Sequence, residues 1–145
     1  MIAVDTNVLL RRILSDDDEQ AAKARKLFSS DKTVLITDVV LAETVWTLKG
    51  KRYGASKEDV AALVMSLLEE PNIVFENQRA IWSALNDFMA ASPINTANGI
   101  KTADFADALI VNKAKVVARE LNQTYEGTFT FDRAAREIGG TATPQ

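Results

Sequence analysis

The segment IAVDTNVLLRRIL, residues 2–14, joins two kinds of secondary structure at a single aspartate. The short apolar run before Asp5 is typical of a buried strand. The residues after it have the apolar spacing of a helix, which Asp5 or Thr6 can cap. A strand that passes directly into a helix is the first part of a βα unit, from which parallel sheets are built. This segment therefore predicts an α/β fold with an acidic side chain at the carboxyl end of the first strand.

The same alternation continues along the chain. Short apolar runs predict three further strands, at residues 33–36, 72–75 and 128–132. Amphipathic segments with capping residues predict helices, at residues 15–30, 37–50, 56–70, 78–91 and 102–121. Residues 92–101 are rich in turn-forming residues and predict a loop.

Strands separated by helices pair in parallel through right-handed crossovers. The pattern therefore predicts a three-layer α/β/α sandwich around a central, mainly parallel twisted sheet of four to five strands. A chain of 145 residues without an internal linker predicts one domain, which we expect over residues 1–138. Residues 139–145 are expected to form a polar tail.

Composition excludes several chemistries. The chain has no cysteine, which excludes disulfides, thiolate nucleophiles and cysteine zinc sites, and no histidine, the commonest general base. Any metal would therefore be a hard cation held by oxygen atoms. A net charge of -3 argues against a protein that coats nucleic acid by bulk electrostatics. No segment resembles a secretion signal or a membrane span, so we expect a cytoplasmic protein without membrane contact.

Several acidic residues are placed where a metal site is expected. Asp5 and Asp132 end predicted strands, and ligands of open α/β sheets bind beyond those ends. Glu43 and Asp107 have mostly apolar neighbours three and four residues away, and Asp104 precedes Asp107 by one helical turn. Each acid also has a structural interpretation, as a helix cap or as one partner of an ion pair.

Taken together, these acids favour a divalent cation. Burying several carboxylates without a nearby basic residue is costly unless a cation neutralises them. Mg²⁺ and Mn²⁺ prefer carboxylate and water ligands, and they activate water for phosphodiester hydrolysis. The sequence therefore predicts a metal site at the carboxyl edge of the sheet.

Four segments, MIAVDTNVLLRRI, TDVVLAETVWTL, DFADALI and TFTFD, occur in the order and spacing of the PIN-domain family, which the chain resembles over nearly its whole length. The small size resembles the VapC-type ribonuclease toxins of bacterial toxin–antitoxin pairs. The resemblance implies an endoribonuclease that depends on Mg²⁺ or Mn²⁺ and hydrolyses RNA. It also implies a homodimer and a VapB-type antitoxin partner.

The resemblance further implies the site residues. The residues that match the catalytic and metal-binding acids of the family are Asp5, Glu43, Asp107 and Asp132. Supporting polar positions match Asp104, Asn7 and Thr130.

Other functions were weighed against this one. A PIN-like domain that binds RNA or protein without cutting it is the main alternative, together with an RNA-processing nuclease outside a toxin–antitoxin pair. A haloacid-dehalogenase-type phosphatase fits poorly, because Asn7 stands where its proton-donating acid is required. A response-regulator receiver also fits poorly, because this chain lacks its acidic pair and its lysine.

Weaker signals are interpreted as structural. The acidic run at residues 15–19 predicts an exposed helix start. The basic residues that flank the predicted site are interpreted as solvated charge before phosphate contacts: Arg11, Arg12, Lys49, Lys51 and Arg52. Trp46 and Trp82 are expected in the core or at an interface before a base-stacking role.

Overall fold

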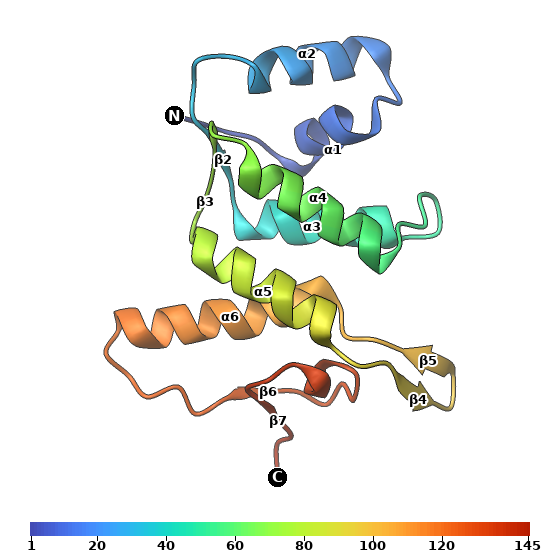
Figure 1. Cartoon of the computed structure of the whole chain (residues 1–145), viewed down its shortest axis with the longest axis vertical. Helices are drawn as coiled ribbons and strands as arrows, with labels where there is room; N and C mark the ends of the chain where they lie inside the picture. The colour runs from blue at the N-terminus through green and yellow to red at the C-terminus, as the bar shows by residue number, and fades with distance from the viewer. The chain divides into compact units, whose positions relative to one another are not determined.

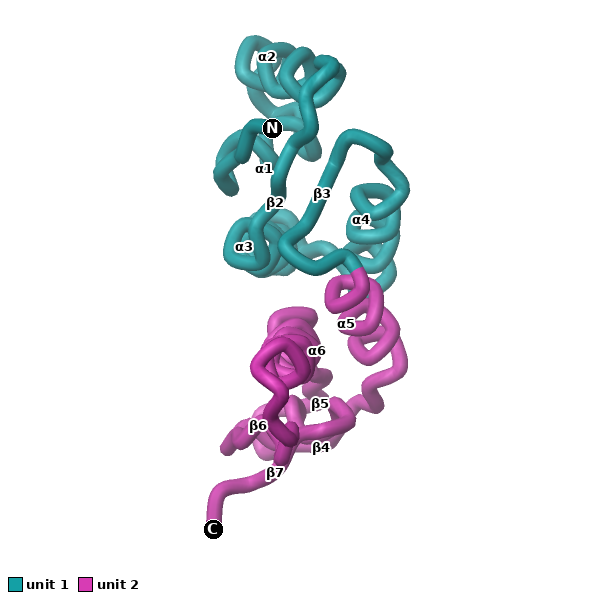
Figure 2. Tube along the Cα trace, turned by 90° about the vertical axis from the view of Figure 1, so that its left-hand side faces the viewer, with its two compact units in different colours: residues 1–78 teal, residues 79–145 magenta.

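A computed structural model describes all 145 residues of the chain. The chain forms two compact units, residues 1–78 and residues 79–145, which Figure 2 distinguishes by colour. We call them unit 1 and unit 2. The single domain expected over residues 1–138 stays a prediction.

Unit 1 is an α/β structure around a parallel sheet (Figure 1). Its three strands pair in parallel in the order β1-β2-β3, with Ile2 opposite Val34 and Val34 opposite Ile73. In Figure 2, α1 and α3 lie on one side of β2 and β3, and α4 lies on the other. The elements are β1 (Ile2–Ala3), α1 (Thr6–Leu14), α2 (Asp18–Phe28), β2 (Val34–Ile36), α3 (Asp38–Lys49), α4 (Lys57–Glu69) and β3 (Ile73–Phe75). The predicted α/β fold with helices on both faces of a parallel sheet is confirmed.

The helices of unit 1 begin where the sequence places capping side chains. Asp5, Asp17, Thr37 and Ser56 each accept a hydrogen bond from a backbone N–H of the first turn that follows. Such a cap stabilises a helix by about 1 kcal/mol because it satisfies a donor that has no partner within the helix. The caps therefore set where each of these helices begins.

The core of unit 1 lies between the sheet and its helices. Val34 and Ile36 of β2 are fully buried, as are Leu9 of α1, Leu41 of α3 and Val64 of α4. These apolar side chains come from all three layers, so burial holds α1 and α3 close to the first two strands.

Unit 2 consists of two helices with short strands around them. Its elements are α5 (Gln78–Ala90, whose first residue closes unit 1), β4 (Ile94–Thr96), β5 (Gly99–Lys101), α6 (Phe105–Glu120), β6 (Thr128–Phe129), a 3-10 helix η1 (Ala135–Glu137) and β7 (Thr141–Ala142). Phe88 of α5 meets Phe105 of α6 edge to face, with ring centroids 6.0 Å apart. Buried Asn112 of α6 donates Nδ2–H to Asp87 Oδ2 of α5 at 2.8 Å. Aromatic packing and a polar bond therefore join the two helices.

The strands differ from expectation in two places. The parallel sheet of unit 1 contains three of the four to five expected strands. The strand expected at residues 128–132 is β6, which pairs in parallel with β7 in unit 2. Strand β7 lies within residues 139–145, where a polar tail was expected.

The loop predicted for residues 92–101 is wrong in part, because Ile94–Thr96 and Gly99–Lys101 form an antiparallel hairpin. Gly99 adopts φ +103°, which a glycine adopts without strain. Strand β5 is exposed along its length, so it lacks the apolar alternation from which strands are predicted. No helix of the chain has the length and apolar composition needed to cross a membrane.

Candidate active site

In unit 1 the structure brings the start of α1 against α3. Asp5 follows β1 and caps α1, and its Oδ1 accepts the backbone N–H of Val8 at 2.9 Å. The next residue, Thr6, donates its hydroxyl to Glu43 Oε2 of α3 at 2.6 Å. Two acids that lie 38 positions apart in sequence are therefore linked through one threonine.

In unit 2 two of the acids belong to the first turn of α6. Asp104 is the N-cap, and Asp107 Oδ2 accepts the backbone N–H of Asp104 at 2.8 Å. The helix was expected from residue 102, but it begins at Phe105. Asp104 and Asp107 therefore meet at the helix end and not along its side.

The last predicted acid, Asp132, follows β6. Its Oδ1 accepts the backbone N–H of Ala134 at 2.8 Å, and its own N–H donates to Thr130 Oγ1 at 3.0 Å. Strand β6 packs against α6, the helix that carries Asp107. Thr130 thus holds the backbone that carries Asp132, and its predicted support of a metal site stays a prediction.

Burial does not distinguish these acids, although the sequence argument expected them on buried faces. Four of them are exposed and Asp107 is half-buried; the exposed ones are Asp5, Glu43, Asp104 and Asp132. Their apolar neighbours in sequence pack elsewhere: Val45 and Leu109 are buried, for example, whereas Val39 and Ile110 are themselves exposed. Helix periodicity located the acids but overestimated their burial.

The donor chemistry fits a hard divalent cation. Asp5, Glu43 and Asp132 each have one carboxylate oxygen held by a protein donor. The other oxygen of each has no protein partner, so it is free to bind a cation. Neither unit alone assembles three or more acidic side chains placed to hold a metal. The predicted ligand set therefore stays a prediction.

Comparison with known families agrees with the order of the acidic segments. A sequence model described as the PIN domain matches residues 2–140. The chain belongs to the PIN-domain family. A search of curated proteins finds no match.

Among solved structures, the chain is similar to VapC20 of Mycobacterium tuberculosis, described as a toxin that cleaves the sarcin–ricin loop. The sequences are 19% identical, the match covers 99% of this chain and 100% of that chain, and the TM-score is 0.39. A likeness of this size defines no substrate for this PIN domain.

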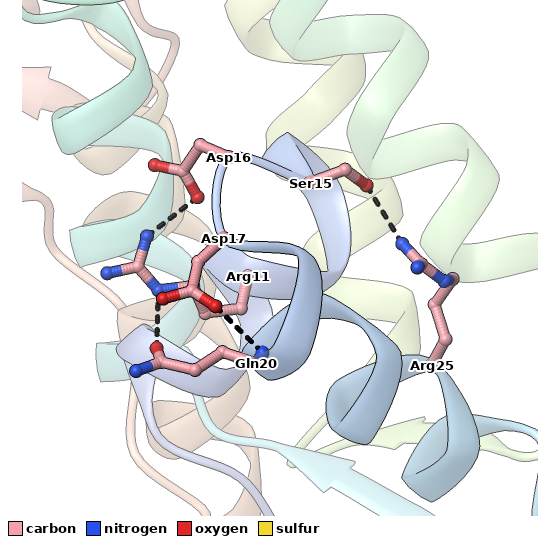
Figure 3. A network of polar contacts seen from close by, with 6 residues as sticks. All are labelled: Arg11, Ser15, Asp16, Asp17, Gln20 and Arg25. Atoms are coloured by element: carbon pink, nitrogen blue, oxygen red, sulfur yellow. Dashed lines mark hydrogen bonds and ion pairs between the residues drawn. The ribbon is translucent and has the colours of Figure 1, made fainter.

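Two basic residues that follow Asp5 on α1 belong to the packing of this PIN domain. Figure 3 shows Arg11 of α1 joined to Asp16 and to Gln20 of α2, at 2.6 Å and 2.8 Å. The bond to Asp16 raises the pKa of Arg11 and lowers the pKa of the Asp16 carboxyl. Arg12 pairs with Glu70 and lies over the ring of Phe28.

The acidic run at residues 15–19 connects α1 to α2 and contains the start of α2, as the sequence predicted. Asp17 caps α2 through the N–H of Gln20 at 2.9 Å, and Ser15 accepts a hydrogen bond from Arg25 at 3.0 Å (Figure 3). Asp18 and Glu19 occupy the first helical turn, where acids favour the helix dipole. This run is therefore a helix start.

Unit 1 contains a cavity between α1 and α2. Its volume is about 320 Å³, and it is lined by Asn7, Val8, Arg11, Gln20, Lys23, Ala24 and Leu27. Asn7, predicted to support the metal site, thus borders this cavity.

Sequence reasoning missed the part played by Thr6. It was considered only as a cap, whereas its hydroxyl binds Glu43. The available signal was its place directly after Asp5 in the first acidic segment of the PIN domain.

Proposed function

We propose that this PIN domain is an endoribonuclease that requires Mg²⁺ or Mn²⁺ and hydrolyses phosphodiester bonds in RNA. The observation that supports it most directly is the link from Asp5 through Thr6 to Glu43, with one carboxylate oxygen of each acid free. Membership of the PIN-domain family supports the same chemistry. In this proposal Asp107 and Asp132 of unit 2 complete the ligand set.

The side chains around the acids act as positioning groups. Thr6 restrains the Glu43 carboxylate, and the backbone N–H groups of Val8 and Ala134 restrain Asp5 and Asp132. A ligand that is already ordered loses less conformational entropy when it binds a cation. Thr130 accepts the backbone N–H of Asp132 and so holds that residue. Asp104 donates its backbone N–H to Asp107 at the start of α6.

Metal binding supplies what the protein side chains lack. A bound divalent cation lowers the pKa of water and offsets the negative charge that develops on the phosphate. The carboxylates would hold the cation in place. The chain contains no histidine to act as a base, so the lowered pKa of the water would come from the cation. The hydrolysis does not require the 2′-hydroxyl of ribose, so the choice of RNA over DNA rests on the resemblance to VapC-type toxins.

The proposal extends to the biological setting. We infer a cytoplasmic toxin that forms a homodimer and is inhibited by a VapB-type antitoxin, on the strength of the same resemblance. Co-expression with the product of the adjacent gene, followed by native mass spectrometry, tests it. A stable complex that suppresses RNA cleavage is expected, and the absence of any complex would count against the toxin assignment.

The enzymatic proposal is tested by incubating mixed-sequence RNA with the purified protein, freed of any co-purified antitoxin. Mg²⁺, Mn²⁺ and EDTA are compared, and Asp5→Asn serves as the inactive variant. We expect cleavage with either metal, none with EDTA, and a loss of at least about a thousandfold in the variant, equal to about 4 kcal/mol. Asp31→Asn, at an exposed turn of unit 1, is a matched control with unchanged activity.

A well-folded protein that cuts no RNA in either metal contradicts the nuclease assignment. Circular dichroism of Asp5→Asn separates loss of chemistry from loss of folding. Replacing Asp5 by the nearly isosteric amide keeps the acceptor oxygen that caps α1, so the fold is expected to survive.

A further inference from the structure

One exposed surface of unit 1 has no role in the site described above. Trp46 of α3 is 76% exposed, although Val45 and Leu48 of the same helix are buried. It follows Glu43 by three residues, so both side chains lie on one face of the helix. Trp46 therefore does not lie in the core, its expected interface position stays a prediction, and an aromatic ring stands one turn from a candidate ligand.

A basic turn follows the end of α3. Exposed Lys51 and Arg52 lie in the turn between α3 and α4. Backbone bonds close this turn, from the N–H of Tyr53 and of Gly54 to Gly50 O, at 3.2 Å and 2.8 Å. The two cations are thus presented from an ordered backbone.

These cations differ in their partners from three other basic residues of unit 1. Arg11, Arg12 and Lys23 each form an ion pair with a carboxylate. Lys51 and Arg52 form none, and the Arg52 guanidinium lies 5.2 Å from the centroid of the Tyr53 ring. The charge of Arg52 also helps to lower the pKa of the Asp16 carboxyl, whose ion pair is with Arg11. In a protein of net charge -3, two adjacent cations without an ion pair still leave local positive charge available for an anionic partner.

We propose that Trp46, Lys51, Arg52 and Tyr53, here called the α3 surface, bind single-stranded RNA and lead it toward Glu43. A nucleobase stacks on Trp46, and Lys51 and Arg52 contact phosphates. Aromatic rings beside cations are the usual combination for single strands, because every base offers a ring face and every nucleotide a phosphate. The inference rests on the proposed ribonuclease function and names the part of the protein that holds its substrate.

The charges favour RNA over a protein partner on this face. Protein interfaces have an apolar centre from which charged residues are depleted. On α3 the other large exposed apolar residue is Val39, and Glu43 stands between it and Trp46. The apolar surface is therefore interrupted by a carboxylate, which suits a site that ends at a metal-binding acid.

The first test measures binding without cleavage. A fluorescein-labelled single-stranded RNA of about 12 nucleotides is titrated in EDTA, and its anisotropy is recorded. Trp46→Ala is expected to weaken binding about 5- to 150-fold, the range for loss of one stacked base. Trp46→Phe should retain most of the affinity, because a ring remains. Trp82→Ala, which removes the other tryptophan, 46% exposed on α5, should leave the affinity unchanged.

The second test measures the phosphate contacts through salt. Each phosphate contact contributes about 0.7 to the slope of log affinity against log salt for single strands. The double substitution Lys51→Gln with Arg52→Gln should therefore lower the slope by about 1.4. Lys26→Gln with Lys32→Gln changes the net charge equally at exposed positions in and after α2, and it should leave the slope unchanged.

Intrinsic fluorescence then reports directly on the α3 surface. Trp82→Phe leaves Trp46 as the one tryptophan, and unlabelled RNA is expected to quench its emission in a saturable way. Absence of quenching, together with unchanged binding by Trp46→Ala, overturns the inference. A change of oligomeric state in Trp46→Ala with unaltered RNA affinity also overturns it, and would identify the face as a protein interface.

The outcome is separable from that of the proposed function. RNA binding that depends on Trp46 in a protein that never cleaves would sustain the α3 surface and refute the nuclease. Metal-dependent cleavage in which Trp46→Ala leaves KM unchanged would sustain the nuclease and refute RNA binding by the α3 surface. If both proposals hold, Trp46→Ala raises KM and leaves kcat close to that of the wild type.

Discussion

The acids of unit 1 and those of unit 2 are held in different ways. In unit 1, Thr6 at the start of α1 binds Glu43 on α3, so a tertiary hydrogen bond spans 37 residues. In unit 2, Asp107 accepts the N–H of Asp104 three residues away, and Asp132 accepts the N–H of Ala134 two residues away. The first arrangement exists only in the folded unit, whereas a short peptide can form the second.

This difference affects how well the carboxylates of each unit are ordered before a cation binds. A side chain held across two packed helices is ordered before the metal arrives, and that order strengthens binding. Local turns order a carboxylate less firmly, because they open whenever the end of the helix or loop frays. We therefore expect unit 1 to be the better prepared half of the proposed site.

The largest expected effect tests whether unit 2 contributes at all. Asp107→Asn removes a ligand charge at nearly constant shape and should reduce RNA cleavage by at least about a thousandfold. Cleavage rates in Mg²⁺ are compared with those of Glu120→Gln, an exposed position at the end of the same helix. If Asp107→Asn retains wild-type activity in a folded protein, Asp107 is not a ligand of the proposed site.

The next effect compares the two modes of support. Thr6→Val removes the hydroxyl that restrains Glu43 and is expected to lower kcat/KM about 10- to 100-fold, as for other groups that orient metal ligands. Thr130→Val removes the acceptor of a local bond and should cost less than about tenfold. A larger loss in Thr130→Val than in Thr6→Val would reverse the ranking of the two halves.

Among the buried polar side chains, the hydrogen bond between helices lies in unit 2 and the local one lies in unit 1. Buried Asn112 bonds Asp87 of another helix, whereas buried Thr44 of unit 1 donates only to Val40 O of its own helix. Asn112→Ala should therefore reduce the free energy of unfolding by about 1–3 kcal/mol, and Thr44→Val by less than about 1 kcal/mol. Urea unfolding measures both, and equal losses would remove the distinction between tertiary and local bonds.

The smallest effect concerns a local cap and pH. Ser56 donors lower the pKa of the Asp59 carboxyl at the start of α4, first through the backbone N–H. Because the folded pKa lies below the unfolded one, this contribution is complete above about pH 5 and declines as pH falls through about 4 toward the folded pKa. The thermal midpoint of Asp59→Asn should thus fall slightly below that of the wild type at neutral pH and converge with it in acid. A difference that grows on acidification would contradict the sign of this pKa shift.

Much of the fold was predictable because its signals are local. Helices α1, α3, α4 and α5 lie within about two residues of their expected bounds, since caps such as Thr37 and Ser56 mark where a helix begins. The three strands of unit 1 are apolar runs, as expected of strands covered on both faces. The hairpin of residues 94–101 was missed because its strands are three residues long and β5 is exposed along its length.

The candidate site was predictable in identity but not in environment. Residue type and order were enough to select Asp5 and Glu43, because acids after a strand and on the following helices indicate oxygen ligands. The exposure of these acids could not be predicted, because helical spacing gives the direction of a side chain but not whether another element covers it. Trp46 illustrates the same limit, because its apolar character predicted a position in the core or at an interface and the structure places it outside the core.

By itself the sequence determined the α/β class, the helix starts and the oxygen-only chemistry of this PIN domain, because these depend on neighbouring residues and on composition. Only the tertiary structure decided that Thr6 binds Glu43, that Arg11 and Arg12 are committed to ion pairs, and that the cations after α3 have none. The physical reason is that hydrogen bonds and ion pairs act over a few ångströms. Their partners are therefore chosen by the packing that brings distant segments together.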